Sequence, residues 1–269
     1  MEKTTYSFSR ITTFEQCARR FRLRYLDGVR EGFRSVEAFV GQQVHSTLEW
    51  LFTQREQGSA PTAEQTVGRY CELWDSEVVS PGGPVKLVRR DRPMEAYRKD
   101  GARIVDTFHR ERFSSDRLKT EAVEGHLAMD LGAYRFQGFI DRLARDERGL
   151  LHIIDYKTGR RVPRSFSGKE AEQLEAYAAL VFSAGQEREL NLVLEFVRNG
   201  KRRSHRISAD EAVAIAGRLK TRIDAVEAST VFPPSPGRLC DWCGFNDICD
   251  AYGDQRSSAR GDEPFSISL

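Results

Sequence analysis

Two short stretches, residues 138–141 (Gly-Phe-Ile-Asp) and 153–159 (Ile-Ile-Asp-Tyr-Lys-Thr-Gly), decide the fold and the candidate site. Apolar residues flank both stretches, and charges on such central strands need a partner or a metal. Alternate side chains of a strand share a face, so Asp155 and Lys157 point the same way. A three-residue turn between the strands pairs Asp141 directly with Asp155. The sequence therefore predicts two carboxylates about 5 Å apart, with an ammonium beside them.

Two carboxylates this close repel each other unless a divalent cation lies between them. Mg²⁺ prefers oxygen ligands and commonly takes one or two carboxylates, which leaves positions for water and phosphate oxygens. Such an ion activates water and neutralises phosphate charge, and Lys157 would hold that water or stabilise the pentacovalent phosphorus. These residues indicate metal-dependent phosphodiester cleavage, although Asp-x-Lys alone is a weak motif that solvated strand-end charges also produce.

Two predicted helices carry further candidate residues. The apolar stripe of helix 36–54 leaves His45 on another face, where imidazole could bind a metal, but a lone helical histidine is more often structural. Helix 169–183 is amphipathic and carries Gln173 and Tyr177. Its periodicity assigns neither residue a role.

The chain contains five cysteines. Because we find no signal peptide and no apolar run long enough to cross a bilayer, we expect a cytoplasmic protein with no membrane partner and no disulfides. Cys240, Cys243 and Cys249 lie close together in the sequence, which suits a structural Zn²⁺ or an iron–sulfur cluster, each normally with four ligands. Cys17 and Cys71 are the candidates for the fourth ligand. The spacing does not distinguish zinc from iron–sulfur.

At 269 residues the chain reads as one domain over 1–253. We divide it into a helical N-terminal part (1–120), an α/β core (121–230) and a cysteine segment (231–253). A polar tail at 254–269 is expected to be disordered.

Periodicity and turn residues predict the elements of this domain as an α/β fold. Helices are predicted at 10–26, 36–54, 63–79, 94–113, 169–183 and 208–228. Strands are predicted at 122–131, 134–144, 150–158, 190–197 and 202–207. The first three strands form an antiparallel meander, and the last two form a hairpin that turns at Asn199-Gly200.

A net charge of +2 and a pI near 8.3 do not by themselves indicate nucleic acid. The distribution of arginines is more informative. Arg20 and Arg24 lie in the first helix, while Arg160 and Arg161 follow the strand that carries Lys157, where a phosphate would bind. We expect these four arginines to contact a nucleic-acid backbone, although basic runs are usually only solvated faces.

In their order along the chain, these motifs resemble the RecB-like branch of the PD-(D/E)XK nuclease superfamily, which includes the nuclease domains of RecB and AddB and the small CRISPR-associated exonucleases. The matching stretches are 7–25, 41–49 (Gly-x-x-x-His, then Leu-Glu), 138–142, 154–159 and Gln173-x-x-x-Tyr177. The stretch 58–119 shows no resemblance.

The resemblance implies a restriction-endonuclease-like core, in which a central mixed sheet is flanked by helices, with a helical N-terminal region and a C-terminal cysteine cluster. It implies two sets of residues around this core. The metal ligands would be His45, Asp141, Asp155 and the carbonyl of Tyr156, with Lys157 catalytic and with Gln173 and Tyr177 lining the site against the nucleic acid. Cys17, Cys240, Cys243 and Cys249 would hold a [4Fe-4S] cluster, rather than zinc, that joins the two ends of the domain.

The function implied is a Mg²⁺- or Mn²⁺-dependent DNA nuclease, most simply an exonuclease on single strands or duplex ends, in DNA repair, recombination or foreign-DNA processing. The sequence has no Gly-x-x-x-x-Gly-Lys-Ser/Thr loop, so a separate helicase would supply movement along DNA. A CRISPR or recombination protein is the other expected partner. The alternatives are a non-catalytic nucleic-acid-binding subunit that retains the fold and the cluster, and a zinc-stapled protein without nucleic-acid function.

Overall fold

One mixed six-stranded sheet forms the centre of the computed structural model, which describes residues 3–78, 84–185 and 187–253. Its strands are β1 (Thr4–Ser7), β4 (Lys119–Leu131), β5 (Tyr134–Arg145), β6 (Leu151–Lys157), β7 (Glu189–Phe196) and β8 (Lys201–Ser208). The strand order is β1-β5-β6-β7-β8, with β4 paired to β5. The β1–β5 and β6–β7 pairs are parallel, and the others are antiparallel. The predicted tail, 254–269, lies outside the described residues.

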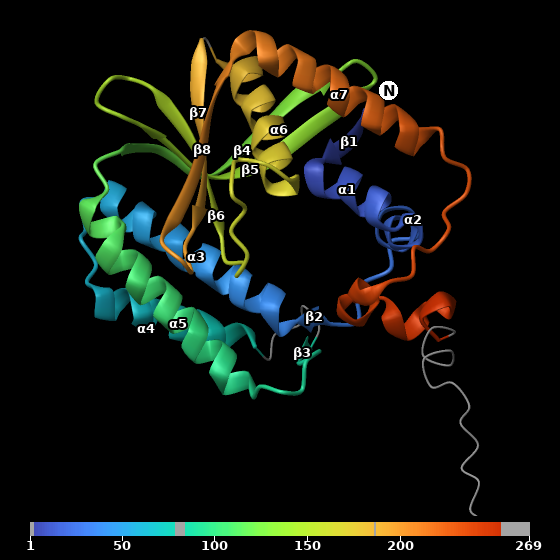
Figure 1. Cartoon of the computed structure of the whole chain (residues 1–269), viewed down its shortest axis with the longest axis horizontal. Coiled ribbons are helices and arrows are strands. Elements are labelled where there is room, and N and C mark those ends of the chain that lie inside the picture. The colour runs from blue at the N-terminus through green and yellow to red at the C-terminus, as the bar shows by residue number, and fades with distance from the viewer. Residues whose placement is uncertain (1–2, 79–83, 186, 254–269) are drawn as a thin grey trace, which may run out of the picture.

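Helices cover both faces of this sheet (Figure 1). One face packs against α1 (Phe8–Gln16), α6 (Lys169–Ala184) and α7 (Ala209–Glu227), and the other against α3 (Val36–Glu56), α4 (Ala63–Glu77) and α5 (Met94–Glu111). Short elements complete the fold: α2 (Ala18–Phe21), a π-helical turn (Arg22–Leu26), the strands β2 (Arg34–Ser35) and β3 (Val85–Lys86), and 3₁₀ turns at Phe113–Ser115, Arg238–Trp242 and Asn246–Ile248. The predicted α/β class, with a central mixed sheet flanked by helices, is confirmed.

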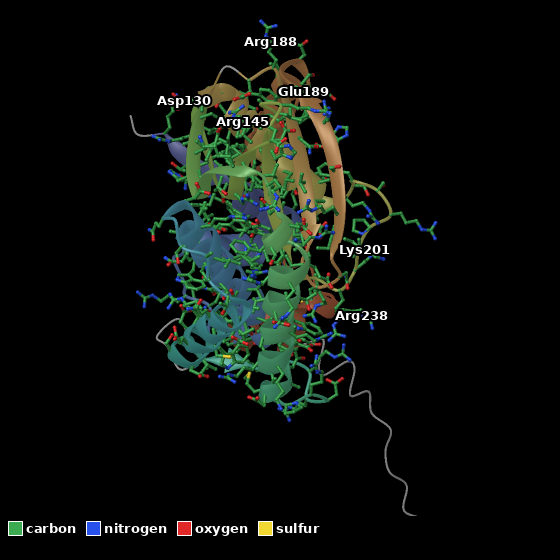
Figure 2. The ribbon with its side chains drawn as sticks, turned by 90° about the vertical axis from the view of Figure 1, so that its left-hand side faces the viewer. Asp130, Arg145, Arg188, Glu189, Lys201 and Arg238 are labelled. Carbon is green, nitrogen blue, oxygen red and sulfur yellow. The ribbon has the colours of Figure 1, made fainter. Side chains whose placement is uncertain are left out.

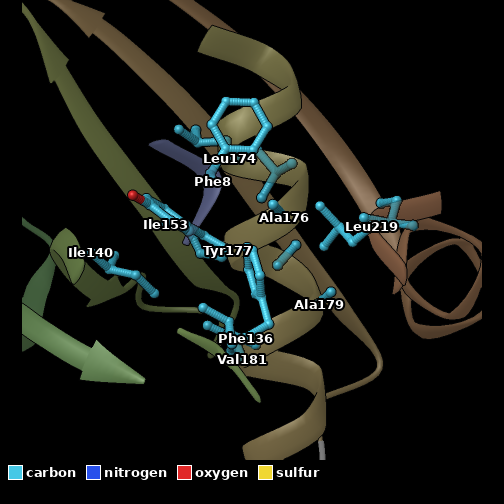
Figure 3. Packing of buried hydrophobic residues seen from close by; sticks show 14 of the residues in the cluster. Phe8, Phe136, Ile140, Ile153, Leu174, Ala176, Tyr177, Ala179, Val181 and Leu219 are labelled. Carbon is cyan, nitrogen blue, oxygen red and sulfur yellow. The ribbon is translucent and has the colours of Figure 1, made fainter. Parts of the chain in front are cut away.

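Strand β6 shows why the sheet needs two helical layers. Ile153 belongs to the apolar cluster on the α6 side, whereas Ile154 and Tyr156 belong to the cluster on the α3 and α5 side. A strand buried on both faces reads as a nearly continuous apolar run, which is the pattern seen at 150–154. Figure 3 shows the α6 side, where Leu174 and Tyr177 of the helix lie among sheet residues.

Strand β5 has a gap in its pairing that forms the site. Strand β4 pairs along β5 on one edge, so β1 and β6 share the other edge. The β1 pairing ends at Gln137, and the β6 pairing begins at Arg142. Residues 138–141, the Gly-Phe-Ile-Asp motif, therefore lie between two strand partners, where the sheet opens.

The predicted turns agree with the structure. The β5–β6 turn has Gly149 at φ +85°, and the β7–β8 turn has Gly200 at φ +59°, both in the left-handed region that favours glycine. Helix α7 begins with the capping box of Ser208 and Glu211. The antiparallel meander of β4, β5 and β6 is confirmed as well.

The predicted helix at 10–26 is wrong as one continuous element. Cys17 has extended backbone angles (φ −162°, ψ 105°) that separate α1 from α2, and the last turn is π-helical. Ser7 caps α1 by accepting a hydrogen bond from Arg10 N. The N-terminal part also contributes β1 to the main sheet, which sequence periodicity did not indicate because the strand has only four residues.

The two ends of the fold lie side by side, with the 3₁₀ turns of the C-terminal segment next to α2 in Figure 1. Two backbone hydrogen bonds join these ends: Gly32 N donates to Gly244 O at 2.7 Å, and Arg19 N donates to Pro233 O at 3.2 Å. At the far end of the sheet, Arg145 bridges Glu121 and Glu187. Figure 2 labels Arg145 near the top of the view. Within the described residues, we find no helix with the length and apolar character that crossing a bilayer requires.

Candidate active site

Three possible metal ligands meet where the sheet opens. His45 comes from α3, Glu124 from β4 and Asp141 from β5, and one ligand atom of each lies within 4.8 Å of the others. His45 Nδ1 is 3.3 Å from Asp141 Oδ2, which also accepts a hydrogen bond of 2.8 Å from Tyr156 N. Two of the predicted ligands, His45 and Asp141, are thus brought together, and they are joined by a carboxylate that sequence reasoning missed.

Glu124 reaches the site through an unusual backbone conformation. It is the one non-glycine residue with positive φ (+47°) in the described chain. Such a conformation is uncommon for a residue with a side chain, and it clusters at functional sites. The register could have revealed this residue: Leu131 pairs with Tyr134 across the Gly132-Ala133 turn, and counting back along both strands places Glu124 opposite Asp141.

Electrostatics in this cluster favour a bound cation. Burial alone would lower the pKa of His45, but the hydrogen bond and the charge of Asp141 outweigh it and raise that pKa to about 9. Burial, together with the charge of Asp141, raises the pKa of Glu124 to about 7. The side chains thus hold extra protons to balance their charges, and a divalent cation can take the place of those protons.

A second group of side chains surrounds Lys157. Its Nζ lies 2.6 Å from Asp155 Oδ2 and donates a hydrogen bond of 3.0 Å to Gln173 Oε1. Gln173 Nε2 in turn contacts the hydroxyl of Tyr177 at 2.8 Å. Asp155 is only 3% exposed, and this burial raises its pKa, while the charge of Lys157 opposes the rise. The four predicted residues therefore form one connected chain from β6 to α6.

Two glycines of the sequence motifs allow the helices to approach this closely. A Cβ on Gly138 would lie 2.5 Å from Cε1 of Tyr177, so only glycine leaves room for that ring. A Cβ on Gly41 would lie 3.2 Å from Oγ1 of Thr158, where α3 crosses the end of β6. The glycines of the motifs thus set the distance from α3 and α6 to the catalytic strands.

The predicted nucleic-acid arginines fall into two places. Arg20 and Arg24 both contact Glu31, at 2.9 Å and 3.4 Å, away from the carboxylates and near the C-terminal segment. Arg160 and Arg161 follow β6, as expected, and both are exposed. All four stay predictions as nucleic-acid contacts.

A cationic cavity that sequence analysis did not predict opens beyond the end of β6. Its volume is about 490 Å³. Asp100 on α5 lies at its wall and contacts arginines from four segments, at distances of 3.0 to 3.5 Å: Arg92, Arg103, Arg160 and Arg198. The residues that line the cavity include four arginines (Arg89, Arg92, Arg160 and Arg198) and three carboxylates (Glu37, Asp91 and Asp100), which leaves a formal charge of +1. A wall of this charge can accept a phosphate.

The five cysteines lie in two places. One small cavity is lined by Cys17, Cys240, Cys243 and Cys249, together with apolar residues that include Leu23 and Phe245. Cys71 lies on α4 and packs against the other apolar cluster, on the α3 and α5 side of the sheet. The structure therefore brings four cysteines from both ends of the fold to one place.

With this geometry established, comparison with known proteins identifies the family. A family model described as the PD-(D/E)XK nuclease superfamily matches residues 5–250, which is nearly the whole chain. The chain belongs to the PD-(D/E)XK nuclease superfamily. A solved structure titled "Crystal structure of SSO0001" is similar at 19% sequence identity and a TM-score of 0.39, covering 94% of this chain and 88% of that one. A search of curated proteins found no match.

The site described above brings carboxylates, an imidazole and a lysine close together. Carboxylates and an imidazole can hold the divalent ion, and a lysine beside them can stabilise developing negative charge.

Proposed function

We propose that this protein is a Mg²⁺- or Mn²⁺-dependent DNA nuclease that acts as an exonuclease on single strands or duplex ends. The observation that carries the proposal is the contact of Lys157 with Asp155, beside the cluster of His45, Glu124 and Asp141. A lysine and several carboxylates in one partly buried site are costly to maintain without a function.

The donor set fits a divalent ion of this kind. Carboxylate oxygens suit both Mg²⁺ and Mn²⁺, and the imidazole of His45 makes Mn²⁺ the better match. Asp141, Glu124 and His45 would hold the ion, with Asp155 and the Tyr156 carbonyl as further ligands. When bound, the ion would supply an activated water and neutralise phosphate charge.

The protein's own residues orient the reaction. Asp155 and Gln173 hold the ammonium of Lys157 from two sides, which fixes its position before substrate arrives. Lys157 then stabilises negative charge at the scissile phosphate, and Tyr177 lines the entry through its contact with Gln173. The cavity beside Asp100 would receive a neighbouring phosphate of the same strand.

We infer that Cys17, Cys240, Cys243 and Cys249 hold a structural [4Fe-4S] cluster, with Zn²⁺ as the alternative. Support comes from the single cavity that these four residues line and from its apolar surroundings. Iron bound there would join the N-terminal and C-terminal segments across more than two hundred residues of chain.

The expected partners are DNA and a separate helicase, or a recombination or CRISPR protein that delivers DNA. We expect the protein to act in the cytoplasm, in DNA repair, recombination or foreign-DNA processing, as a member of the RecB-like branch. Arg160 and Arg161 would contact the nucleic-acid backbone beside the end of β6, and Arg20 and Arg24 would contact it farther from the carboxylates.

An assay with anaerobically purified protein tests this function. The substrates are end-labelled linear single strands, end-labelled duplexes and a closed circular single strand, each with Mn²⁺, with Mg²⁺ or with EDTA. We expect metal-dependent loss of the linear DNAs and an intact circle. Cleavage of the circle would show an endonuclease. Tight DNA binding with no cleavage in either metal would show the non-catalytic subunit instead.

A further inference from the structure

An aromatic pair extends from the metal cluster along the surface of β4 and β5. Phe139 is 55% exposed, which makes it one of the few large apolar side chains that the described protein shows to solvent. His126 pairs with it across the strands, and their rings lie 4.8 Å apart, tilted by 36°. This position on a central strand would normally be covered or polar.

The pair lies directly beside the proposed scissile phosphate. Phe139 and Asp141 are two residues apart and share one face of β5, so they lie about 6.6 Å apart along the strand. Opposite them on β4, His126 follows Glu124 with the same spacing. A phosphate at the carboxylates therefore places the base of the same nucleotide within reach of Phe139.

The chemistry of the surface favours a base over a phosphate or an acidic peptide. Phe139 carries no charge and no hydrogen-bond donor, so its side chain offers nothing that binds a phosphate or a carboxylate. A base is flat and neutral, and every base has a face that stacks on an aromatic ring. Gln137 Oε1 lies 3.1 Å from His126 Nε2, so the histidine ring is held in place before a ligand arrives.

We propose that Phe139, supported by His126 and Gln137, is a stacking platform for a base of single-stranded DNA at the active site. The proposal rests on the nuclease function proposed above and adds a substrate class to it. A stacked base needs an unpaired strand, so the platform favours single strands, or frayed ends, over intact duplex.

Binding measurements with ring-specific variants test the platform. In a Lys157→Ala background, which prevents cleavage, fluorescence anisotropy gives the dissociation constant for a labelled oligothymidylate in Mn²⁺. We expect Phe139→Ala and Phe139→Leu to weaken binding roughly 5- to 100-fold, because one stacked base is lost. Phe139→Tyr should restore binding. Val213→Ala, which removes an apolar side chain that is 73% exposed on α7, is the matched control and should change nothing.

A spectroscopic readout separates stacking from a structural effect. An oligonucleotide with terminal 2-aminopurine should lose fluorescence on binding when position 139 is Phe or Tyr, and keep it with Ala or Leu. Equal binding and equal quenching by all four proteins, with DNA cleavage intact in the parent, would overturn the platform but not the nuclease. A change of oligomeric state in Phe139→Ala would also overturn it, since Phe139 would then belong to a protein contact. No binding and no cleavage of any DNA by the wild type would overturn both.

Discussion

At the scale of single residues, one fully buried charge outside the active site is Arg142, the residue after Asp141. It is 1% exposed and donates to both carboxylate oxygens of Asp116, at 2.8 Å and 3.0 Å. Its guanidinium also lies 3.8 Å from the ring centre of Phe52. This arginine therefore ties β5 to α3 and to the start of β4, directly behind the metal cluster.

Removing one partner of this buried ion pair should destabilise the fold strongly. We expect Asp116→Asn to lower the free energy of unfolding at pH 7 by about 3 to 5 kcal/mol, because Arg142 keeps its charge without its partner. Urea denaturation measures the change. Glu189→Gln breaks the exposed Arg206–Glu189 pair (Figure 2) and should cost less than about 1 kcal/mol. Equal losses in the two variants would contradict the buried role.

The pH dependence of this pair has a definite sign. Burial alone would raise the pKa of Asp116, but the hydrogen bond and charge of Arg142 outweigh it and lower that pKa below its ordinary value. The pKa of Asp116 is lower in the folded protein than in the unfolded chain, where it is about 3.9. The ionised carboxylate therefore stabilises the fold above about pH 3.9, and this stabilisation is lost as the pH falls through the folded-state pKa. The stability gap between wild type and Asp116→Asn should therefore narrow below pH 4. A constant gap down to pH 2 would contradict this.

Glu124 is the residue that structure adds to the site. We expect Glu124→Gln to weaken Mn²⁺ binding about 10-fold or more, because the cluster loses one charged ligand. Isothermal titration calorimetry measures the affinity. Glu121→Gln, on the same strand but ion-paired with Arg145, is the matched control. Unchanged Mn²⁺ affinity in Glu124→Gln would remove this residue from the metal site.

At the scale of elements, Gly138 allows α6 to pack closely against β5. Because a Cβ there would lie 2.5 Å from Tyr177, Gly138→Ala should displace that ring and, through Gln173, the ammonium of Lys157. We expect about 10²-fold slower cleavage and a loss of about 1 to 3 kcal/mol of stability.

A second substitution tests whether Gly138→Ala acts by displacing the Tyr177 ring. Tyr177→Ala removes the ring that an added Cβ would meet, so Gly138→Ala should cost little further stability in the Tyr177→Ala background, and the two losses will not add. Gly217→Ala on α7, where nothing lies within 4 Å of the added Cβ, should leave cleavage unchanged. Additive stability losses at positions 138 and 177 would show that the ring was not displaced.

The elements also show which parts of the fold could be predicted from the sequence. Strong turn residues such as Gly149 and Gly200 indicated the hairpins, alternating apolar residues indicated β5, and a nearly continuous apolar run indicated β6. The break at Cys17 was missed because a helical apolar pattern continues on both sides of it. Glu124 was missed because a carboxylate on an amphipathic strand looks like any solvated charge until the opposite strand is placed. The arginines around Asp100 meet only through tertiary packing.

At the scale of the whole molecule, the cysteine cavity joins the ends of the chain. We expect Cys17→Ala, Cys240→Ala, Cys243→Ala and Cys249→Ala each to lose iron and much of their solubility, because ligands that meet only in the folded state couple binding to folding. Cys71→Ala, on α4, should keep its iron and its brown colour. Iron and sulfide analysis of the five anaerobically purified variants measures this. Full iron in Cys17→Ala, or its loss in Cys71→Ala, would contradict the ligand set.

The central claim is that one metal-dependent site, with Lys157 beside Asp155, cleaves DNA. The most direct measurement is the rate at which wild type and Lys157→Ala degrade end-labelled single-stranded DNA in saturating Mn²⁺. The account predicts rapid degradation by the wild type, none in EDTA, and degradation by the folded variant that is slower by about 10²-fold or more. Equal rates for the two folded proteins would contradict it.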